Sequence, residues 1–249
     1  MLAFITGASS GIGKNMAYYL SEKGYDLIIV AKDETKLKEV QKNIKTKCEI
    51  ISCDVAKESE VIKLFSQVKE RDIDVAINNA GFGLFGEFVE TDLDRELEMI
   101  NVNIQAYHIL TKLFLQKFVK EDKGYILNTC SMAGFMAGPR LSTYYATKNY
   151  ITKLTMAINE ELRIRKSNVS ISALCPGPVN TNFNATAKGI FHLKEANAKE
   201  VAKIGIDGML KKKMLIVPSI SMNVFLFFLR LTPYRLQLKI AYNLQERID

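Results

Sequence analysis

The sequence is poor in the residues that build metal centres and disulfide frameworks. Only four cysteines and two histidines occur among 249 residues, with no CxxC pair and no Cys/His spacing of the zinc type. A chain of this length buries a core large enough to fold without metals or disulfides. The cysteine pattern therefore favours free thiols in a reducing compartment, and we predict no metal site.

Long hydrophobic runs are also missing. The apolar run Leu2–Ile5 is too short for the core of a signal peptide, so we interpret it as a first buried strand. The segment Ile216–Leu231 is interrupted by a proline, two serines and an asparagine, and it is shorter than the ~20 apolar residues that span a membrane. We expect a cytoplasmic protein.

Positive charge is concentrated near the C-terminus. The formal net charge is +7, of which residues 211–249 carry +5 and the preceding 210 residues only +2. A basic protein can bind nucleic acid, an anionic membrane or a phosphorylated ligand. No nucleic-acid module is recognisable, and the basic residues are not interleaved with aromatics as in a strand-binding groove, so we predict no nucleic-acid partner.

Short apolar runs alternate with longer segments of helical periodicity. The expected strands are Leu2–Ile5, Asp26–Val30, Glu49–Ser52, Val75–Asn78, Tyr125–Thr129, Val169–Leu174 and Met214–Val217. The expected helices are Lys14–Lys23, Glu34–Ile44, Glu58–Glu70, Leu93–Val119 and Thr143–Ile164. This order predicts an α/β, doubly wound Rossmann fold with a mainly parallel seven-stranded sheet. Without repeats or linkers, residues 1–249 form one domain, in which 182–200 is a candidate substrate flap.

Residues 219–249 form a predicted amphipathic helical extension. Met222, Phe225, Leu226 and Leu229 make an apolar stripe, and Leu236, Ile240, Leu244 and Ile248 make a second. We favour the interpretation that these helices cover the substrate cleft or pack against another subunit. The alternative is peripheral attachment to anionic lipid, which basic amphipathic helices with bulky apolar residues suit. Both interpretations point to a lipophilic substrate.

A glycine-rich turn follows the first expected strand and precedes a helix. In Thr6–Gly13, Gly7 allows the tight turn, Gly11 lets the backbone approach a pyrophosphate, and Gly13 permits close helix–strand packing. The spacing is GxxxGxG, and alone it could be a purely structural turn. The strand before it and the helix after it favour a phosphate site at the helix N-terminus.

The end of the second strand bears on cofactor choice. An acid at this position binds the ribose 2′-hydroxyl in NAD-dependent proteins. Here Ala31 cannot accept a hydrogen bond, whereas Lys32 could pair with a 2′-phosphate. This favours NADP(H) over NAD(H), unless Lys32 is merely a solvated loop lysine. We interpret Asp33 as the N-cap of the next helix.

Polar residues also end the third and fourth strands. Asp54, followed by Val55, could contact an adenine amino group or simply stabilise a turn. Asn78–Gly81 could border a cofactor groove and link neighbouring strands, or form an ordinary polar turn.

Ser131, Tyr144 and Lys148 form the candidate catalytic group. Tyr144 and Lys148 are four residues apart and share one face of a helix. A free tyrosine has a pKa near ~10, too high for acid–base catalysis at neutral pH, and a neighbouring ammonium would lower it. The Ser131 hydroxyl, at the end of the fifth strand, could polarise a carbonyl. The adjacent Cys130 and Cys175 are interpreted as small core residues.

With these motifs in order, the chain resembles the classical short-chain dehydrogenase/reductase family over essentially its whole length. The matching motifs are Thr6–Gly13 (TGxxxGxG), Asn78–Gly81 (NNAG), Asn103–Ala106, Ser131, Tyr144xxxLys148 and Pro176–Thr181 (PGxVxT). The resemblance implies Tyr144 as general acid/base, Lys148 as the group that lowers its pKa and holds the nicotinamide ribose, and Ser131 as carbonyl donor. It also implies that Asn103, in preference to Asn101, holds a proton-relay water, and that Thr181 contacts the carboxamide.

The implied cofactor residues lie in the same motifs. They are Gly7, Ser9, Ser10, Gly11, Ile12, Gly13, Lys32, Asp54, Val55, Asn79, Ala80, Gly81, Tyr144, Lys148, Pro176, Gly177, Val179 and Thr181. Ser10 departs from NADP(H)-preferring members that carry a basic residue there, so the cofactor prediction depends on Ala31 and Lys32.

The resemblance implies an NADP(H)-dependent oxidoreductase that moves a hydride between nicotinamide and a carbonyl or secondary alcohol. It also implies a homodimer or homotetramer. The alternative is a non-enzymatic NADP(H)-binding sensor or scaffold on the same fold, which the presence of Ser131, Tyr144 and Lys148 disfavours.

Overall fold

A seven-stranded parallel sheet runs through the molecule. The computed structural model describes residues 1–181, 183, 189–191, 195–229, 231–243 and 245–247. The strand order is β3-β2-β1-β4-β5-β6-β8, and every pairing in this sheet is parallel. The strands are β1 (Leu2–Thr6), β2 (Asp26–Ala31), β3 (Cys48–Ser52), β4 (Val75–Asn78), β5 (Tyr125–Thr129), β6 (Ser170–Leu174) and β8 (Leu215–Ile216).

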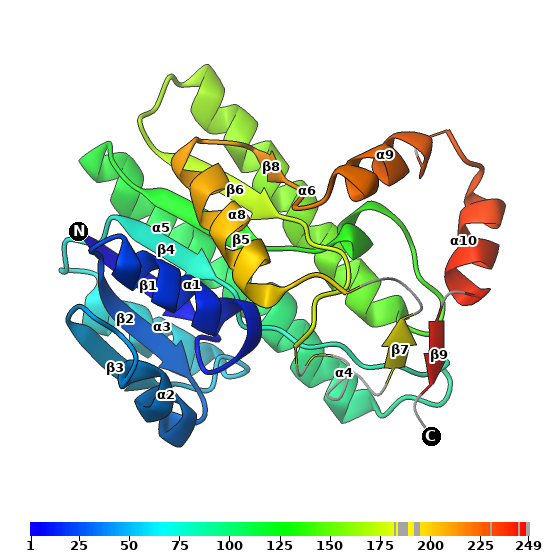
Figure 1. Ribbon diagram of the computed structural model, residues 1–249, viewed down its shortest axis with the longest axis horizontal. Coiled ribbons are helices and arrows are strands. Elements are labelled where there is room, and N and C mark those ends of the chain that lie inside the picture. The colour runs from blue at the N-terminus through cyan, green and yellow to red at the C-terminus, as the bar shows by residue number, and fades with distance from the viewer. Residues whose placement is uncertain (182, 184–188, 192–194, 230, 244, 248–249) are drawn as a thin grey trace.

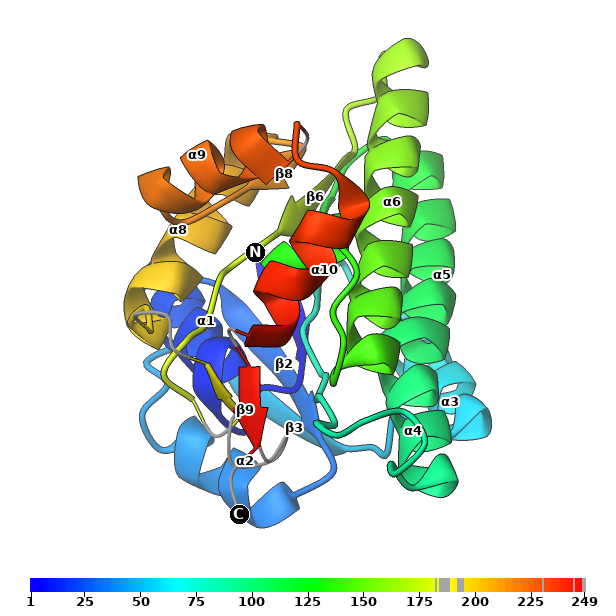
Figure 2. The same ribbon diagram turned by 90° about the vertical axis from the view of Figure 1, so that its right-hand side faces the viewer.

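Helices cover both faces of this sheet (Figures 1 and 2). On one face lie α1 (Gly11–Glu22), α2 (Glu34–Gln41) and α8 (Ala198–Leu210). On the other lie α3 (Glu58–Val68), α5 (Tyr107–Glu121) and α6 (Ser142–Ile164). Because both faces are covered, the central strands are buried and mainly apolar, as the sequence predicted, with polar residues such as Asn78 and Asn128 toward their carboxyl ends. The predicted doubly wound α/β fold is confirmed.

The expected helix Leu93–Val119 is one long helical segment with a local change of pitch. It comprises α4 (Leu93–Ile100), a π-helical turn η1 (Asn101–Ala106) and α5. Such π-helical turns widen a helix locally and often occur at functional sites.

Two elements near the candidate flap were not predicted. Helix α8 begins at Ala198, where the side chain of Asn197 accepts a hydrogen bond from the Lys199 amide, so the last residues of the predicted flap 182–200 are helical. Within the flap, β7 (Gly189–Phe191) is a strand and pairs antiparallel with β9 (Gln245–Arg247) near the C-terminus. The strand is defined by its backbone hydrogen bonds to β9, whereas the side-chain pattern of the flap did not predict a strand. Residues 182, 184–188 and 192–194 lie outside the described part of the chain.

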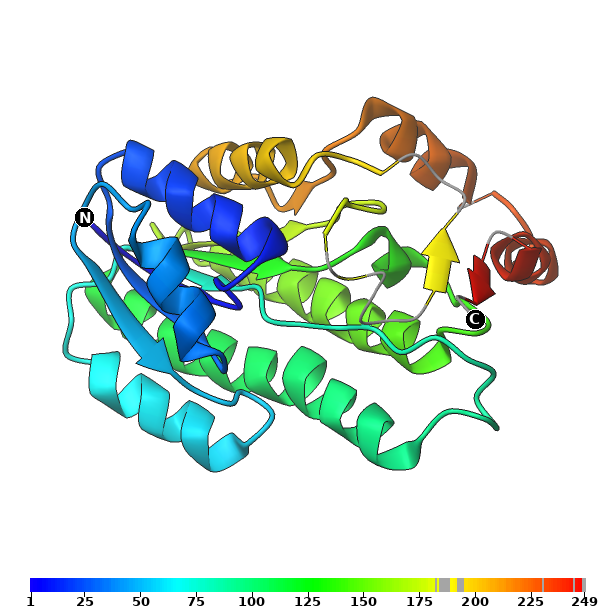
Figure 3. The ribbon, with the colours of Figure 1, turned by 60° about the horizontal axis from the view of Figure 1, so that its bottom comes forward.

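The C-terminal extension is helical only in part. It forms α9 (Ile220–Leu229) and α10 (Tyr234–Asn243) and then the strand β9, so the second predicted helix is too long. Figure 3 shows α10 and the β7–β9 ribbon at the end of the molecule opposite the N-terminus. No helix among the described residues is long and apolar enough to cross a membrane.

The two predicted apolar stripes have different outcomes. In α9, Leu226 and Leu229 are buried with Met222 packed beside them, but Phe225 is exposed. In α10, Leu236 and Ile240 are exposed while Gln237 and Ala241 face inward, so the second stripe was wrong. Leu244 and Ile248 lie outside the described residues. Gln237 is tolerated inside because its amide donates to the carbonyls of Leu229 and Thr232, at 2.9 and 2.7 Å.

Candidate active site

The predicted site residues gather at the carboxyl ends of the strands. The chain runs outward from β1 through β2 to β3, and then returns to place β4 on the other side of β1. The loops after β1 and β4 therefore part at this point and leave a crevice, where ligands bind in sheets of this kind. The remaining predicted cofactor residues lie at the same edge, Ile12 in the first turn of α1 and the others on the loops after β1, β3, β4 and β6: Ser9, Ser10, Val55, Ala80, Gly81, Pro176, Gly177 and Val179.

The glycine turn packs against the loop after β4 without room for a side chain. Gly7 has a φ of +65°, and a Cβ there would lie 2.7 Å from the Ala80 Cα. A Cβ on Gly13 would lie 2.3 Å from the Gly7 carbonyl oxygen and 2.4 Å from the Asn79 Nδ2. Glycine is thus required at both positions by the close approach of two backbones, as the motif predicted.

Asn79 holds this turn in place. Its amide donates to the carbonyls of Thr6 and Gly7, both at 3.2 Å, and its carbonyl accepts from the Thr129 hydroxyl at 3.2 Å. Beside it, Asn78 donates to Asn128 at 2.9 Å. The strand-end asparagines therefore link neighbouring strands, which is one of the two roles expected of them.

The N-terminus of α1 is suited to an anion. Ser10 is the N-cap residue, but its side chain makes no capping hydrogen bond, and the first turn contains no acidic residue. The amide groups of this turn therefore keep their positive partial charge without a side-chain partner. Together with the glycine turn, this arrangement fits the pyrophosphate of a dinucleotide.

Lys32 lies at the end of β2 as predicted, but it is already paired. Its Nζ is 3.0 Å from the Asp54 carboxylate, and its side chain is largely exposed. Asp54 also accepts from the Ala56 amide at 3.2 Å, so it does stabilise a turn. Asp33 caps α2 by accepting from the Lys36 amide at 3.0 Å, which confirms the predicted N-cap.

Ser131, Tyr144 and Lys148 come together where the carboxyl end of β5 meets the N-terminal part of α6. The Ser131 side chain is close enough to Tyr144 to lower its pKa through hydrogen bonding. The Lys148 Nζ donates to the Thr129 carbonyl at 2.9 Å and lies 5.9 Å from the centre of the Tyr144 ring. Tyr144 and Lys148 are both buried.

Burial sets the pKa values of this group. It raises the pKa of Tyr144 well above its usual value, and this outweighs the lowering effect of the Ser131 hydrogen bond. It lowers the pKa of Lys148 to about 8. The expected lowering of the Tyr144 pKa is therefore not found in the protein alone, because desolvation penalises a buried phenolate more than its neighbours stabilise it.

Asn103 lies in η1 and is fully buried beside Lys148 and Gly81. Its amide donates to the Phe82 carbonyl at 2.9 Å and to the Thr147 hydroxyl at 3.1 Å, and its carbonyl accepts from the Phe82 amide. A Cβ on Gly81 would lie 3.1 Å from the Asn103 Oδ1 and 3.5 Å from the Lys148 Nζ. The side chain of Asn103 thus joins the loop after β4 to α6, and its role toward a relay water stays a prediction.

Apolar residues surround the catalytic group on two sides. On one side the Tyr144 ring is 5.2 Å from the ring of Phe183 and packs with Phe85, Met99 and Leu141. On the other side, Met132 follows Ser131 directly and packs with Leu226 and Leu229 of α9. Thr181 accepts from the Phe183 amide at 3.2 Å and approaches Gly11, so the loop after β6 crosses the crevice.

Three contributors were not identified from the sequence. Thr129 supplies the carbonyl that receives the Lys148 hydrogen bond, Thr147 holds Asn103, and Phe183 covers the Tyr144 ring. Thr147 lies between Tyr144 and Lys148, which is a signal that could have been used. A backbone carbonyl and a flap aromatic leave no such pattern.

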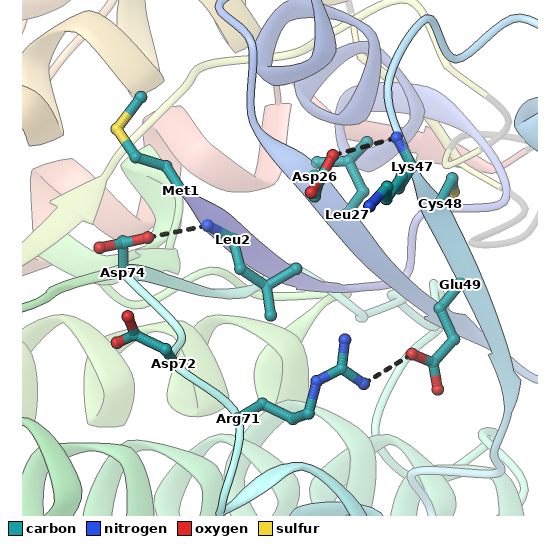
Figure 4. A pocket seen from close by; sticks show the side chains of 10 residues that line it. All are labelled: Met1, Leu2, Asp26, Leu27, Lys47, Cys48, Glu49, Arg71, Asp72 and Asp74. Carbon is teal, nitrogen blue, oxygen red and sulfur yellow. Dashed lines mark hydrogen bonds and ion pairs between the residues drawn. The ribbon is translucent and has the colours of Figure 1, made fainter.

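A cavity of about 410 Å³ lies away from these residues, at the amino ends of β1, β2 and β3 (Figure 4). Several of its polar groups are already satisfied: Asp74 accepts from the Leu2 amide, Asp26 accepts from the Lys47 amide, and Arg71 pairs with Glu49. We assign it no chemistry. Among the described residues, no cluster of histidine, cysteine and acidic side chains is placed to hold a metal ion. Cys130 and Cys175 are buried in the core behind Lys148, as predicted.

Comparison with known proteins agrees with the fold. Residues 1–189 match the family model described as short chain dehydrogenase. An uncharacterized oxidoreductase of Staphylococcus epidermidis is 30% identical over 182 residues, which cover 72% of this chain and 78% of that protein.

Solved structures share the fold. A short-chain dehydrogenase from Sphingobium yanoikuyae in complex with NADPH superposes with a TM-score of 0.84 at 26% identity, covering 92% of both chains. A short-chain dehydrogenase/reductase from Burkholderia phymatum in complex with NAD has a TM-score of 0.84 at 22% identity, covering 95% of both chains, and shows the fold alone.

Proposed function

The chain belongs to the short-chain dehydrogenase family, and on that basis we propose that it is an NADP(H)-dependent oxidoreductase that interconverts a carbonyl and a secondary alcohol on a lipophilic substrate. The observation that carries the proposal is the group of half-buried Ser131 with buried Tyr144 and Lys148, at the same edge of the sheet as the glycine turn. When bound, the nicotinamide supplies or accepts the hydride.

Tyr144 is the proton donor in the direction of carbonyl reduction. Its raised pKa keeps the phenol protonated at neutral pH, so a proton is available at the Oη as negative charge develops on the substrate oxygen. The Ser131 hydroxyl, hydrogen bonded to Tyr144, stabilises the same oxygen. Lys148 places a positive charge near the phenolate that remains, which opposes the cost of its burial.

Lys148 gives the reaction a defined pH dependence. Its pKa of about 8 means that its positive charge is lost above that pH, while Tyr144 stays protonated. We expect kcat/KM for carbonyl reduction to be level below pH 8 and to fall about tenfold per pH unit above it, as loss of one proton requires. Lys148→Met should be slow at every pH and should lack this alkaline limb. An unchanged limb in the variant would assign it to another group.

Lys148 also makes the free energy of unfolding depend on pH. Between pH 8 and 10.5 the unfolded chain keeps the Lys148 proton that the folded chain has lost, so Lys148 contributes a rise in the free energy of unfolding with pH across this range. Chemical denaturation at several pH values should therefore show a free energy of unfolding that rises with pH in the wild type relative to Lys148→Met. Equal slopes in the two proteins would contradict a lowered Lys148 pKa.

The preference for NADP(H) is proposed from Lys32. It is the basic side chain at the end of β2, next to an alanine where an NAD-dependent protein carries an acid. In Lys32→Glu we expect KM for NADPH to rise at least tenfold and KM for NADH to change much less, because a carboxylate repels a 2′-phosphate and can accept from a 2′-hydroxyl. Lys63→Glu on α3, where the lysine is also exposed, is the charge-matched control and should leave both values unchanged. Equal effects on the two cofactors would remove the preference.

The proposed substrate class rests on the apolar walls around Tyr144 and Ser131. Consumption of NADPH measured with ketones, β-keto esters, quinones and long-chain carbonyls tests the proposed function. We expect turnover with bulky or long-chain carbonyls and little with short polar ones. NADPH binding without turnover on any of them would favour the sensor or scaffold alternative.

A further inference from the structure

Helices α9 and α10 carry an unusual density of exposed apolar side chains. Of the 21 large hydrophobic residues exposed in the described part of the chain, 11 lie between residues 220 and 242, under a tenth of the sequence. They are Ile220, Val224, Phe225, Phe227, Phe228, Leu231, Tyr234, Leu236, Leu238, Ile240 and Tyr242. We call this set the α9–α10 apolar surface. Exposed apolar side chains gathered on two consecutive helices are candidates for an interaction surface.

Most of this surface, Tyr242 excepted, does not hold α9 and α10 to the rest of the fold. Helix α9 already fixes itself to the body through Met222, Leu226 and Leu229. Helix α10 is fixed by Gln237 and by Tyr242, which accepts a hydrogen bond from Arg140 at 2.8 Å and stacks under its guanidinium at 3.9 Å. The phenylalanines on the remaining sides of α9, Phe227 and Phe228, are about 60% exposed. The described part of the chain leaves more than half of each of these two side chains exposed.

The segment of the chain that carries the surface has charges of one sign, although Glu87 of the body lies 3.4 Å from the Tyr242 hydroxyl. Residues 211–243 contain six lysines and arginines and no acidic residue. Lys211 and Lys213 line a depression of about 310 Å³ together with Asn223 of α9, and Arg235 and Lys239 are exposed on α10. Asp207, the acid in that depression, is already paired with Lys203 at 2.7 Å and Lys23 at 3.4 Å.

We propose that the α9–α10 apolar surface docks the protein onto an anionic lipid bilayer. Bulky apolar side chains can enter the acyl boundary while the adjacent lysines and arginines contact lipid phosphates, which is the combination that interfacial helices use. A second copy of the chain fits less well, because joining two of these surfaces would bring two acid-free basic segments together. The proposal stands apart from the oxidoreductase activity, since it concerns binding.

The α9–α10 apolar surface lies next to elements that border the catalytic group, so docking on a bilayer would affect access to the active site. The inner side of α9 packs on Met132, which follows Ser131 directly, and α10 is followed by β9, which pairs with the flap strand β7. Figures 1 and 3 show these elements together at the end of the molecule where the strands point. A bilayer on this surface would lie against the elements that border the catalytic group, so a lipophilic carbonyl could enter without crossing water.

Flotation of the full chain with vesicles tests the proposal. We expect it to float with vesicles of phosphatidylcholine and phosphatidylglycerol, to float at least tenfold less with phosphatidylcholine alone, and to be released by high salt. Phe227→Ser/Phe228→Ser should reduce flotation at least tenfold. Arg235→Glu/Lys239→Glu should do so without altering an apolar side chain. The matched control is Ile62→Ser/Ile164→Ser, two exposed apolar residues on α3 and α6, which should float like the wild type.

Three results would overturn the proposal. The first is a wild type that stays at the bottom of the gradient with anionic vesicles. The second is equal binding to neutral and anionic vesicles. The third is a wild-type oligomer, measured by light scattering, that Phe227→Ser/Phe228→Ser dissociates without any change in flotation, since a second copy would then cover the surface. Circular dichroism of each variant separates loss of binding from loss of fold.

Discussion

Replacing Tyr144 with phenylalanine should reduce kcat for carbonyl reduction by roughly 10²–10⁴-fold, the range that a positioned general acid contributes. The change deletes one oxygen from a buried ring that packs against Phe183. The apolar contacts stay, so the protein should fold and should bind NADPH with an unchanged Kd. Steady-state kinetics and fluorescence titration measure the two quantities separately.

A matched control lies on the same helix. Tyr150 is exposed, and its hydroxyl pairs with His108 at 2.8 Å, away from the catalytic group. Tyr150→Phe makes the same chemical change and should keep wild-type kcat. Tyr144→Phe with full activity would remove Tyr144 from the mechanism, and a large loss in Tyr150→Phe would show that the effect is not specific to the site.

Adding one methyl group at Gly13 should disable the cofactor site. The new Cβ would meet the Gly7 carbonyl oxygen at 2.3 Å and the Asn79 Nδ2 at 2.4 Å. Gly7 cannot move away easily, because it is already in close contact with the backbone of Ala80. We expect Gly13→Ala to lower the free energy of unfolding by roughly 1–3 kcal/mol, as overpacking does. We also expect the Kd for NADPH to rise at least tenfold, because the turn that receives the pyrophosphate is displaced.

Gly24→Ala separates these two effects. Gly24 has a φ of +84° and nothing within 4 Å of an added Cβ. Alanine there should lower stability by about 1 kcal/mol through backbone strain and leave the Kd for NADPH unchanged. If Gly13→Ala binds NADPH as tightly as Gly24→Ala, the glycine turn does not form the phosphate site.

The sequence was sufficient for the main sheet because both of its faces are covered. Strands such as β2 and β4 are then continuous apolar runs, and the amphipathic helices between them have clear polar faces. The strand β7 had no such signal. Within the described part of the chain it pairs with β9 alone, some 55 residues later, and hydrogen bonds between distant backbones leave no pattern in side chains. The apolar stripe predicted for α10 was wrong for a related reason. Hydrogen bonds to backbone carbonyls allow Gln237, a polar residue, to take a buried position.

The site was foreseeable where one residue type is required. Gly7 and Gly13 could be predicted because close backbone contacts leave no room for a side chain there. Tyr144 and Lys148 could be predicted because their spacing places them on one face of a helix. Other features depend on which residues the fold brings together, and the sequence does not show this. Examples are the ion pair of Lys32 with Asp54 and the hydrogen bonds that already occupy the Asn103 side-chain amide. The direction of the Tyr144 pKa shift also depends on how completely the ring is buried, which spacing does not reveal.

The most direct test of the proposed chemistry is the fate of the hydride. NADPH deuterated at the transferring position of nicotinamide C4 would be incubated with the protein and a reactive carbonyl from the screen, and the alcohol product analysed by mass spectrometry. We predict deuterium at the carbinol carbon with wild-type protein, and at least a hundredfold less labelled alcohol per unit time with Tyr144→Phe. An unlabelled alcohol from cofactor labelled on either face, or a labelled one formed equally fast by Tyr144→Phe, would contradict hydride transfer with Tyr144 as the acid.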